Sequence, residues 1–126
     1  MRSITLLTLC LLFNPAWAGC RAFDINMKSI DGRFVDQCTT KQCFHFEGEA
    51  VLSNDCANPV GIKIKITAYD ENGALIASNT AWPAGTTNIP PGDYAFSLSQ
   101  WLPYNPEIKT FALKPVDVEH WREQDL

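Results

Sequence analysis

Residues 62–73 read Ile-Lys-Ile-Lys-Ile-Thr-Ala-Tyr-Asp-Glu-Asn-Gly and contain the clearest strand pattern of the chain. Apolar side chains at positions 62, 64, 66 and 68 alternate with polar or amphipathic ones, which is typical of a strand with one buried face. The Asn72-Gly73 pair that follows tolerates the positive φ that tight hairpin turns need. The stretch therefore predicts a strand, a hairpin turn and a return strand over residues 75–80.

The same alternation recurs on both sides of this hairpin. Residues 44–52 place apolar or small side chains at every second position, and Tyr94, Phe96 and Leu98 share one face of a later strand. An Asp31-Gly32 turn is expected near the start, and Lys114-Pro115 is expected to interrupt the last strand. The sequence predicts about seven short strands in an antiparallel β-sandwich, over residues 23–27, 34–35, 44–52, 62–69, 75–80, 94–98 and 108–113.

The N-terminus has the pattern of a cleavable export signal. Arg2 precedes an apolar run over residues 4–13, and Ala16-Trp17-Ala18 is a small-x-small cleavage site. The run is too short to cross a bilayer as a helix. We expect residues 1–18 to be removed and residues 19–126 to act as a single domain in the periplasm or outside the cell. That domain holds nine basic and fourteen acidic residues, which argues against nucleic acid or an anionic membrane surface as a partner.

An alternative reading of this N-terminus is a lipid anchor. Ala18-Gly19-Cys20 matches the last three positions of a bacterial lipobox, in which the cysteine would be lipidated. Trp17 stands at the position before these three, where a lipobox has Leu, and its bulky indole fits poorly there. Lipidation of Cys20 would also leave an odd number of thiols in an oxidising compartment. Soluble export is therefore the favoured reading, with an outer-membrane lipoprotein as the alternative.

Four cysteines remain after signal removal: Cys20, Cys38, Cys43 and Cys56. Four cysteines allow three pairings, and the sequence does not choose among them. One of them joins Cys38 to Cys43 in a short loop and Cys20 to Cys56. A zinc site of Cys38, Cys43, His45 and Cys56 is the functional alternative. Export favours disulfides over zinc, because metal thiolates are typical of reducing compartments.

Candidate catalytic groups are few. Glu47 and Glu49 share one face of a strand with His45, and His120 lies near the C-terminus. Carboxylates on an exposed strand face usually keep a sheet soluble, and no Gly-x-Ser-x-Gly elbow occurs. The sequence therefore predicts a protein without enzymatic activity or cofactor, and a hydrolase built on these residues is a distant alternative.

Three aromatic residues are the best binding candidates. Trp82, Trp101 and Tyr104 lie in proline-bearing connections, where loops at the ends of a sandwich often contact partners. Trp and Tyr are also enriched among interface hot spots. The alternative is that the two tryptophans cap the open ends of the sandwich. A free sheet edge offered for strand addition is a second route to a partner.

Three segments carry a resemblance to a known family. Residues 48–54, Gly-Glu-Ala-Val-Leu-Ser-Asn, residues 66–70, Ile-Thr-Ala-Tyr-Asp, and residues 91–98, Pro-Gly-Asp-Tyr-Ala-Phe-Ser-Leu, resemble the motifs of the FxLYD-type domains of bacterial envelope proteins. The resemblance covers about residues 46–114. It implies an immunoglobulin-like sandwich and no shared activity.

Together these observations predict an exported, disulfide-bonded protein-interaction module of the bacterial cell envelope, such as an accessory, inhibitor or immunity-type partner of another envelope or secreted protein. The alternative from another class is a periplasmic carrier of a small ligand. It would hold a sugar on Trp101 and Tyr104, or a metal on the Cys/His cluster.

Overall fold

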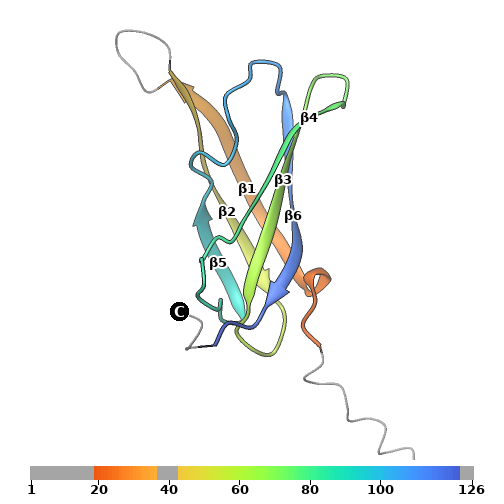
Figure 1. The fold of residues 1–126 in the computed structure, drawn as a ribbon, viewed down its shortest axis with the longest axis vertical. Helices are drawn as coiled ribbons and strands as arrows, with labels where there is room; N and C mark the ends of the chain where they lie inside the picture. The colour runs from red at the N-terminus through yellow and green to blue at the C-terminus, as the bar shows by residue number, and fades with distance from the viewer. Residues whose placement is uncertain (1–18, 37–42, 123–126) are drawn as a thin grey trace, which may run out of the picture.

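The computed structural model describes residues 19–36 and 43–122 and consists of two antiparallel sheets of three strands each (Figure 1). One sheet has the order β1-β2-β5 and the other the order β4-β3-β6. This confirms the prediction of an all-β antiparallel sandwich. The elements are the 3₁₀ turn η2 (Ala22–Asp24) and the strands β1 (Ile25–Asp36), β2 (Phe44–Asn54), β3 (Gly61–Tyr69), β4 (Leu75–Ala81), β5 (Gly92–Ser97) and β6 (Thr110–Glu119).

The connections between the strands follow the immunoglobulin-like pattern. β3 and β4 form the predicted hairpin, whereas the links β2–β3, β4–β5 and β5–β6 cross from one sheet to the other. β1 contacts β6 on one side of the sandwich, and β4 and β5 are the edge strands on the other. In immunoglobulin domains a further strand lies beyond the position of β6. The described residues contain no strand at that place.

The core lies between the two central strands, β2 and β3. Ile62, Ile64, Ile66 and Ala68 point inward as their alternation predicts, and they meet Phe46, Ala50 and Leu52 from β2. Burying one such large aliphatic side chain stabilises a fold by about 1.5–3 kcal/mol. The hairpin turn is held by Asp70, whose Oδ1 accepts the N–H groups of Asn72 at 2.8 Å and Ala74 at 2.9 Å.

The predicted Asp31-Gly32 turn is wrong. β1 runs unbroken through both residues, with Gly32 opposite Gly48 of β2. A Cβ atom on Gly32 would lie 2.7 Å from the ring of Phe46 and 2.8 Å from the ring of Phe111. The glycine therefore makes room for two core rings instead of turning the chain. The two short segments predicted at residues 23–27 and 34–35 belong largely to this one strand, and six strands are described where about seven were expected.

The predicted interruption at Pro115 is also wrong. β6 continues through Pro115 to Glu119, with Pro115 opposite Ile64 of β3 and Val116 as an extra residue at a bulge. A proline has no N–H to donate, so it is tolerated in a sheet where the missing N–H would point away from the neighbouring strand. β6 is an edge strand, which supplies that position.

A disulfide and a buried amide fix the start of β1 to the turn after β2. Cys20 is bonded to Cys56, with the Cα atoms 5.4 Å apart, which is one half of the pairing that joins Cys38 to Cys43 and Cys20 to Cys56. Asn54, which is buried, donates from Nδ2 to the carbonyls of Asn58 (3.2 Å) and Ile89 (2.8 Å) and accepts the N–H of Cys56 at 2.9 Å. Cys43 is disulfide-bonded as well. Its expected partner Cys38 lies outside the described residues, as does the expected export signal over residues 1–18.

Candidate functional site

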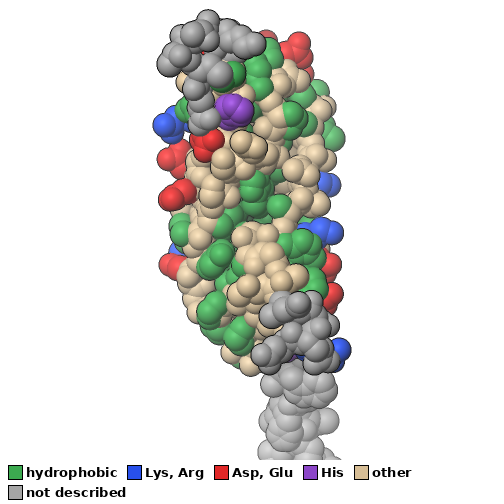
Figure 2. All heavy atoms as spheres, turned by 60° about the vertical axis from the view of Figure 1, so that its left-hand side comes forward, with side chains coloured by type: hydrophobic (Ala, Val, Ile, Leu, Met, Phe, Trp, Pro, Cys, Tyr) green, Lys and Arg blue, Asp and Glu red, His purple; other side chains and the backbone are tan. Residues whose placement is uncertain are grey.

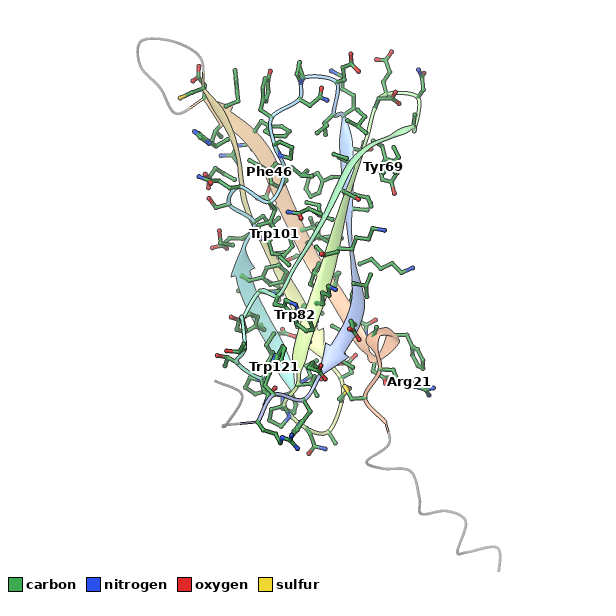
Figure 3. All side chains as sticks on the ribbon, in the orientation of Figure 1. Arg21, Phe46, Tyr69, Trp82, Trp101 and Trp121 are labelled. Atoms are coloured by element: carbon green, nitrogen blue, oxygen red, sulfur yellow. A yellow bond between two sulfur atoms is a disulfide. The ribbon has the colours of Figure 1, made fainter. Side chains whose placement is uncertain are left out.

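Trp101, the first of the predicted binding residues, packs onto the core. Its indole stacks on the ring of Phe96, with centroids 5.6 Å apart, and its carbonyl accepts a hydrogen bond from Nδ2 of Asn79 at 3.1 Å (Figure 3). The bond joins the segment after β5 to β4. Trp101 therefore closes the side of the sandwich where β4 and β5 are the edges, and hydrophobic side chains run down that side (Figure 2).

Trp82 packs against another tryptophan. Its ring meets that of Trp121 edge to face, with centroids 5.2 Å apart, and the ammonium of Lys63 lies 5.8 Å from the Trp82 centroid (Figure 3). The side chain of Asn88 holds the backbone of Trp121 by accepting its N–H (3.0 Å) and donating to its carbonyl (2.8 Å). These bonds keep the chain after β6 beside Trp82. The sequence did not single out Trp121, because nothing local indicates its partner.

Tyr104 contacts a third set of residues. Its ring stacks on Phe44 with centroids 4.6 Å apart and meets Phe34 edge to face at 5.3 Å, and the residue is 46% exposed. No ring contact among the described residues joins Tyr104 to Trp82 or Trp101. The structure does not bring the three predicted residues together into one site.

The predicted acidic pair lies on an outer sheet face. Glu47 stands opposite Arg33 of β1 and accepts the hydroxyl of Ser99 at 3.1 Å, whereas Glu49 stands opposite Asp31. His45 lies opposite Val35 at the start of β2. With these neighbours, both carboxylates are surface groups of the sheet. The zinc alternative fails on its own chemistry, because Cys56 is bonded to Cys20 and offers no thiolate.

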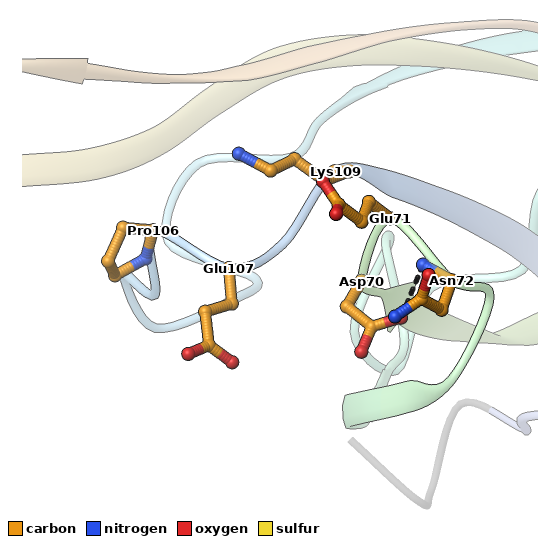
Figure 4. A pocket seen from close by; sticks show the side chains of 6 residues that line it. All are labelled: Asp70, Glu71, Asn72, Pro106, Glu107 and Lys109. Atoms are coloured by element: carbon orange, nitrogen blue, oxygen red, sulfur yellow. Dashed lines mark hydrogen bonds between the residues drawn. The ribbon is translucent and has the colours of Figure 1, made fainter.

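A polar hollow of about 270 Å³ lies between the β3–β4 turn and the segment before β6 (Figure 4). One oxygen of Asp70 already serves the turn, as described above. The hollow is open and its charged groups are on the surface, so it does not enclose a ligand. Its lining residues are Asp70, Glu71, Asn72, Pro106, Glu107 and Lys109.

The side of the sandwich between β1 and β6 is the strongest candidate site. A shallow, mainly apolar hollow of about 390 Å³ lies there, between η2 and the second half of β6. Phe23 is 69% exposed and carries the guanidinium of Arg21 over its ring, 4.6 Å from the centroid. Ile30 and Val116 are exposed as well. The lining residues are Ala22, Phe23, Ile25, Lys114, Pro115 and Val116.

The backbone of β6 is also available at this side. In an antiparallel ladder, pairs of opposite residues that exchange hydrogen bonds alternate with pairs that do not. Pro115 has no N–H, so its pair with Ile64 is of the second kind. Phe111 and Leu113 therefore also turn their N–H and C=O groups away from β3. Within the described residues β6 has no second neighbouring strand to receive them.

Two lysines face outward beside this edge. Lys65 of β3 stands directly opposite Lys114 of β6, an arrangement that places like charges side by side. Among the described residues no carboxylate forms an ion pair with either lysine. Lys28 and Asp93, which form an ion pair at 3.6 Å, belong to the other sheet.

Asp55, whose carboxylate has a lowered pKa, holds the start of β1 in place. Hydrogen bonds from the Ser53 hydroxyl (2.6 Å) and the Asn26 amide (2.5 Å), together with the charge of Lys28, hold the pKa of Asp55 below its usual value. The N–H of Asp55 also donates to the carbonyl of Asp24 at 3.1 Å. These contacts hold η2 in place beside the hollow. Their role is structural, because Asp55 faces solvent and is not one of the residues that line the hollow.

Comparison with known proteins adds no relative to this description. No family model matches the chain, and neither the curated proteins nor the solved structures contain a match. No helix in residues 19–36 and 43–122 is long and apolar enough to cross a membrane.

Proposed function

We propose that this chain is an exported, non-enzymatic protein-interaction module of the bacterial cell envelope. The observation that supports this proposal best is the apolar side between β1 and β6, where Phe23, Ile30 and Val116 are exposed together with an open strand edge. The opposite side of the same sandwich is covered by tryptophans. Exposed apolar surface next to an open edge is typical of a site that another protein covers.

The oxidised cysteines support the proposed location. Disulfides form and persist in the periplasm and outside the cell, and Cys20, Cys56 and Cys43 are all disulfide-bonded. The Cys20–Cys56 bond also favours the soluble form over the lipoprotein, since one sulfur cannot carry both a disulfide and a lipid thioether. The metal carrier would need Cys56 as a thiolate, and the sugar carrier would need Trp101 and Tyr104 to share a surface that the ring contacts do not show.

Site-specific photo-crosslinking tests the proposal. Benzoylphenylalanine is placed at Ile30 or Val116 on the open side and, as the control, at Leu75, an equally apolar residue of β4 that is 63% exposed. The full chain is exported in a bacterial host and irradiated in intact cells. We expect a discrete protein adduct from Ile30 and Val116 and none from Leu75. Adducts of equal yield from all three positions, or from none, would contradict an interaction site on this side.

A further inference from the structure

We propose that an extended segment of the partner protein pairs with the free edge of β6 as an added strand, with apolar side chains facing the hollow and acidic side chains facing the lysines. This inference rests on the proposed function and specifies the chemistry of the partner. Strand addition of this kind combines main-chain hydrogen bonds for affinity with alternate side chains for specificity.

The backbone argument comes from β6 itself. Phe111 and Leu113 turn one N–H and one C=O each toward the open edge, so an incoming strand finds two donors and two acceptors within three residues. Pro115 ends this series, because it supplies a carbonyl without an N–H. The pairing segment is therefore residues 110–114, which is about the length of an ordinary short strand.

The inner side of an added strand would meet apolar surface. Its side chains that share the face of Phe111 and Leu113 would lie between β6 and β1, over Ile30, and near the hollow lined by Phe23 and Val116. Ile30 is 40% exposed although it stands on the core-facing side of β1. Apolar residues at alternate positions of the partner segment would cover this surface and complete the core on this side.

The outer side of an added strand would meet positive charge. Its side chains that share the face of Lys114 would lie beside that ammonium, which already stands opposite Lys65. An acidic side chain there relieves the repulsion between the two lysines, whereas a basic one increases it. Charge complementarity therefore selects a segment in which apolar residues alternate with Asp or Glu.

Two other occupants fit less well. A second copy would offer its own residues 110–115, Thr-Phe-Ala-Leu-Lys-Pro, whose one charged side chain is another lysine. The described residues after β6 turn away from this edge, because Asn88 and Trp82 hold Trp121 on the other side of β3. Neither supplies both the apolar and the acidic positions.

Two synthetic peptides test the inference directly. The first alternates Val and Glu over nine residues, and the second alternates Val and Lys over the same length, both with capped ends. Each is titrated at low salt into the ¹⁵N-labelled exported chain, while chemical shifts and amide exchange are recorded. We expect the Val-Glu peptide to bind about tenfold more tightly than the Val-Lys peptide. It should also slow amide exchange at Phe111 and Leu113 and shift the signals of residues 110–114 and Ile30.

Variants separate the charge contribution from the apolar one. Lys114→Glu should reverse the preference between the two peptides, because its charge faces the outer side of the added strand. Ile30→Lys should weaken both peptides, and the control Leu75→Lys should weaken neither. Circular dichroism and the unfolding midpoint establish that each variant is folded before its binding is compared.

Three outcomes would overturn the inference: equal binding of the two peptides, binding that shifts β4 or β5 instead of β6, or no binding by either peptide. Exchange at Phe111 and Leu113 that is already slow without peptide, and slower at higher protein concentration, would assign the edge to a second copy instead. Crosslinks from Ile30 and Val116 without peptide binding at β6 would leave the proposed function standing and reject strand addition. Absence of both would reject the two together.

Discussion

Ile30 and Ala50 stand opposite each other across the β1–β2 ladder, yet Ala50 is fully buried and 40% of Ile30 is exposed. Directly opposed residues share a face, so both point toward the core. The difference arises from position: β2 is a central strand, whereas β1 is an edge strand with no strand beyond β6 to cover it among the described residues. One side of the sandwich is thus left open where an immunoglobulin-like domain has another strand.

Truncation of Ile30 should therefore cost little stability. We expect Ile30→Ala to lower the free energy of unfolding by less than about 1 kcal/mol, because much of the side chain is already in contact with water. The matched control is Ile64→Ala on β3, whose side chain is fully buried and whose loss should cost about 2–5 kcal/mol. Urea unfolding measures both. Equal losses would mean that Ile30 is covered in solution.

A methyl group at Gly32 should disturb the core. Its Cβ atom would approach the rings of Phe46 and Phe111 to below 3 Å, so Gly32→Ala should destabilise the fold by about 1–3 kcal/mol. Phe111→Leu removes one of the two rings. The double variant should therefore lose less than the sum of the two single losses. Additive losses in the unfolding experiment would show that the two residues do not compete for space.

Removal of the Cys20–Cys56 disulfide should weaken the fold without abolishing its strands. The bond closes a sequence separation of 36 residues, so the Cys20→Ser, Cys56→Ser double variant should lose about 2–4 kcal/mol. The unfolding free energy of the oxidised wild-type chain is the reference. We also expect the hydrogen bond from the N–H of Cys56 to the side chain of Asn54 to be lost, because the disulfide no longer holds Cys56 in place. A double variant as stable as the wild type would contradict the predicted contribution.

Asp55 should make the free energy of unfolding depend on pH in the acid range. Its folded-state pKa is lowered by Ser53, Asn26 and Lys28, so the unfolded chain binds the proton more readily than the folded one. The stabilising contribution is present above the unfolded pKa, near 4, and is lost as the pH falls through the lower folded value. Asp55→Asn should be less stable than the wild type at pH 6 and equal to it near pH 2. A stability difference that grows toward low pH would contradict this sign.

The sequence predicts which residues of a strand face the core, but it does not predict which other strands and side chains lie beside them. Ile62, Ile64, Ile66 and Ala68 were assigned to the core correctly, because a period of two is a local property of the strand. The turn predicted at Gly32 is wrong, because a glycine that makes room for a ring looks the same in sequence as one that turns the chain. The interruption predicted at Pro115 is wrong for a related reason. Whether its missing N–H faces a neighbouring strand or an open edge depends on which strands lie beside β6.

The candidate site was missed for the same physical reason. Ile30 and Val116 are far apart in the sequence, and only the strand order places both on one side of the sandwich. The prominent aromatic residues are predicted to bind because they lie in proline-bearing connections and because Trp and Tyr are enriched at interface hot spots. Two of them, Trp82 and Trp101, meet other rings that close the opposite side. That a free sheet edge could receive a partner was expected from the sequence, but which of the four edges could not be.

Residue-by-residue amide hydrogen exchange along β6 measures whether the outer edge of this strand is open. The deduced ladder leaves the N–H groups of Phe111 and Leu113 at the open edge and turns those of Ala112 and Lys114 toward β3. In the isolated chain we predict fast exchange at Phe111 and Leu113 and slow exchange at Ala112 and Lys114. Equal protection at all four positions, unchanged on dilution, would show that the edge is already covered and would exclude strand addition at β6.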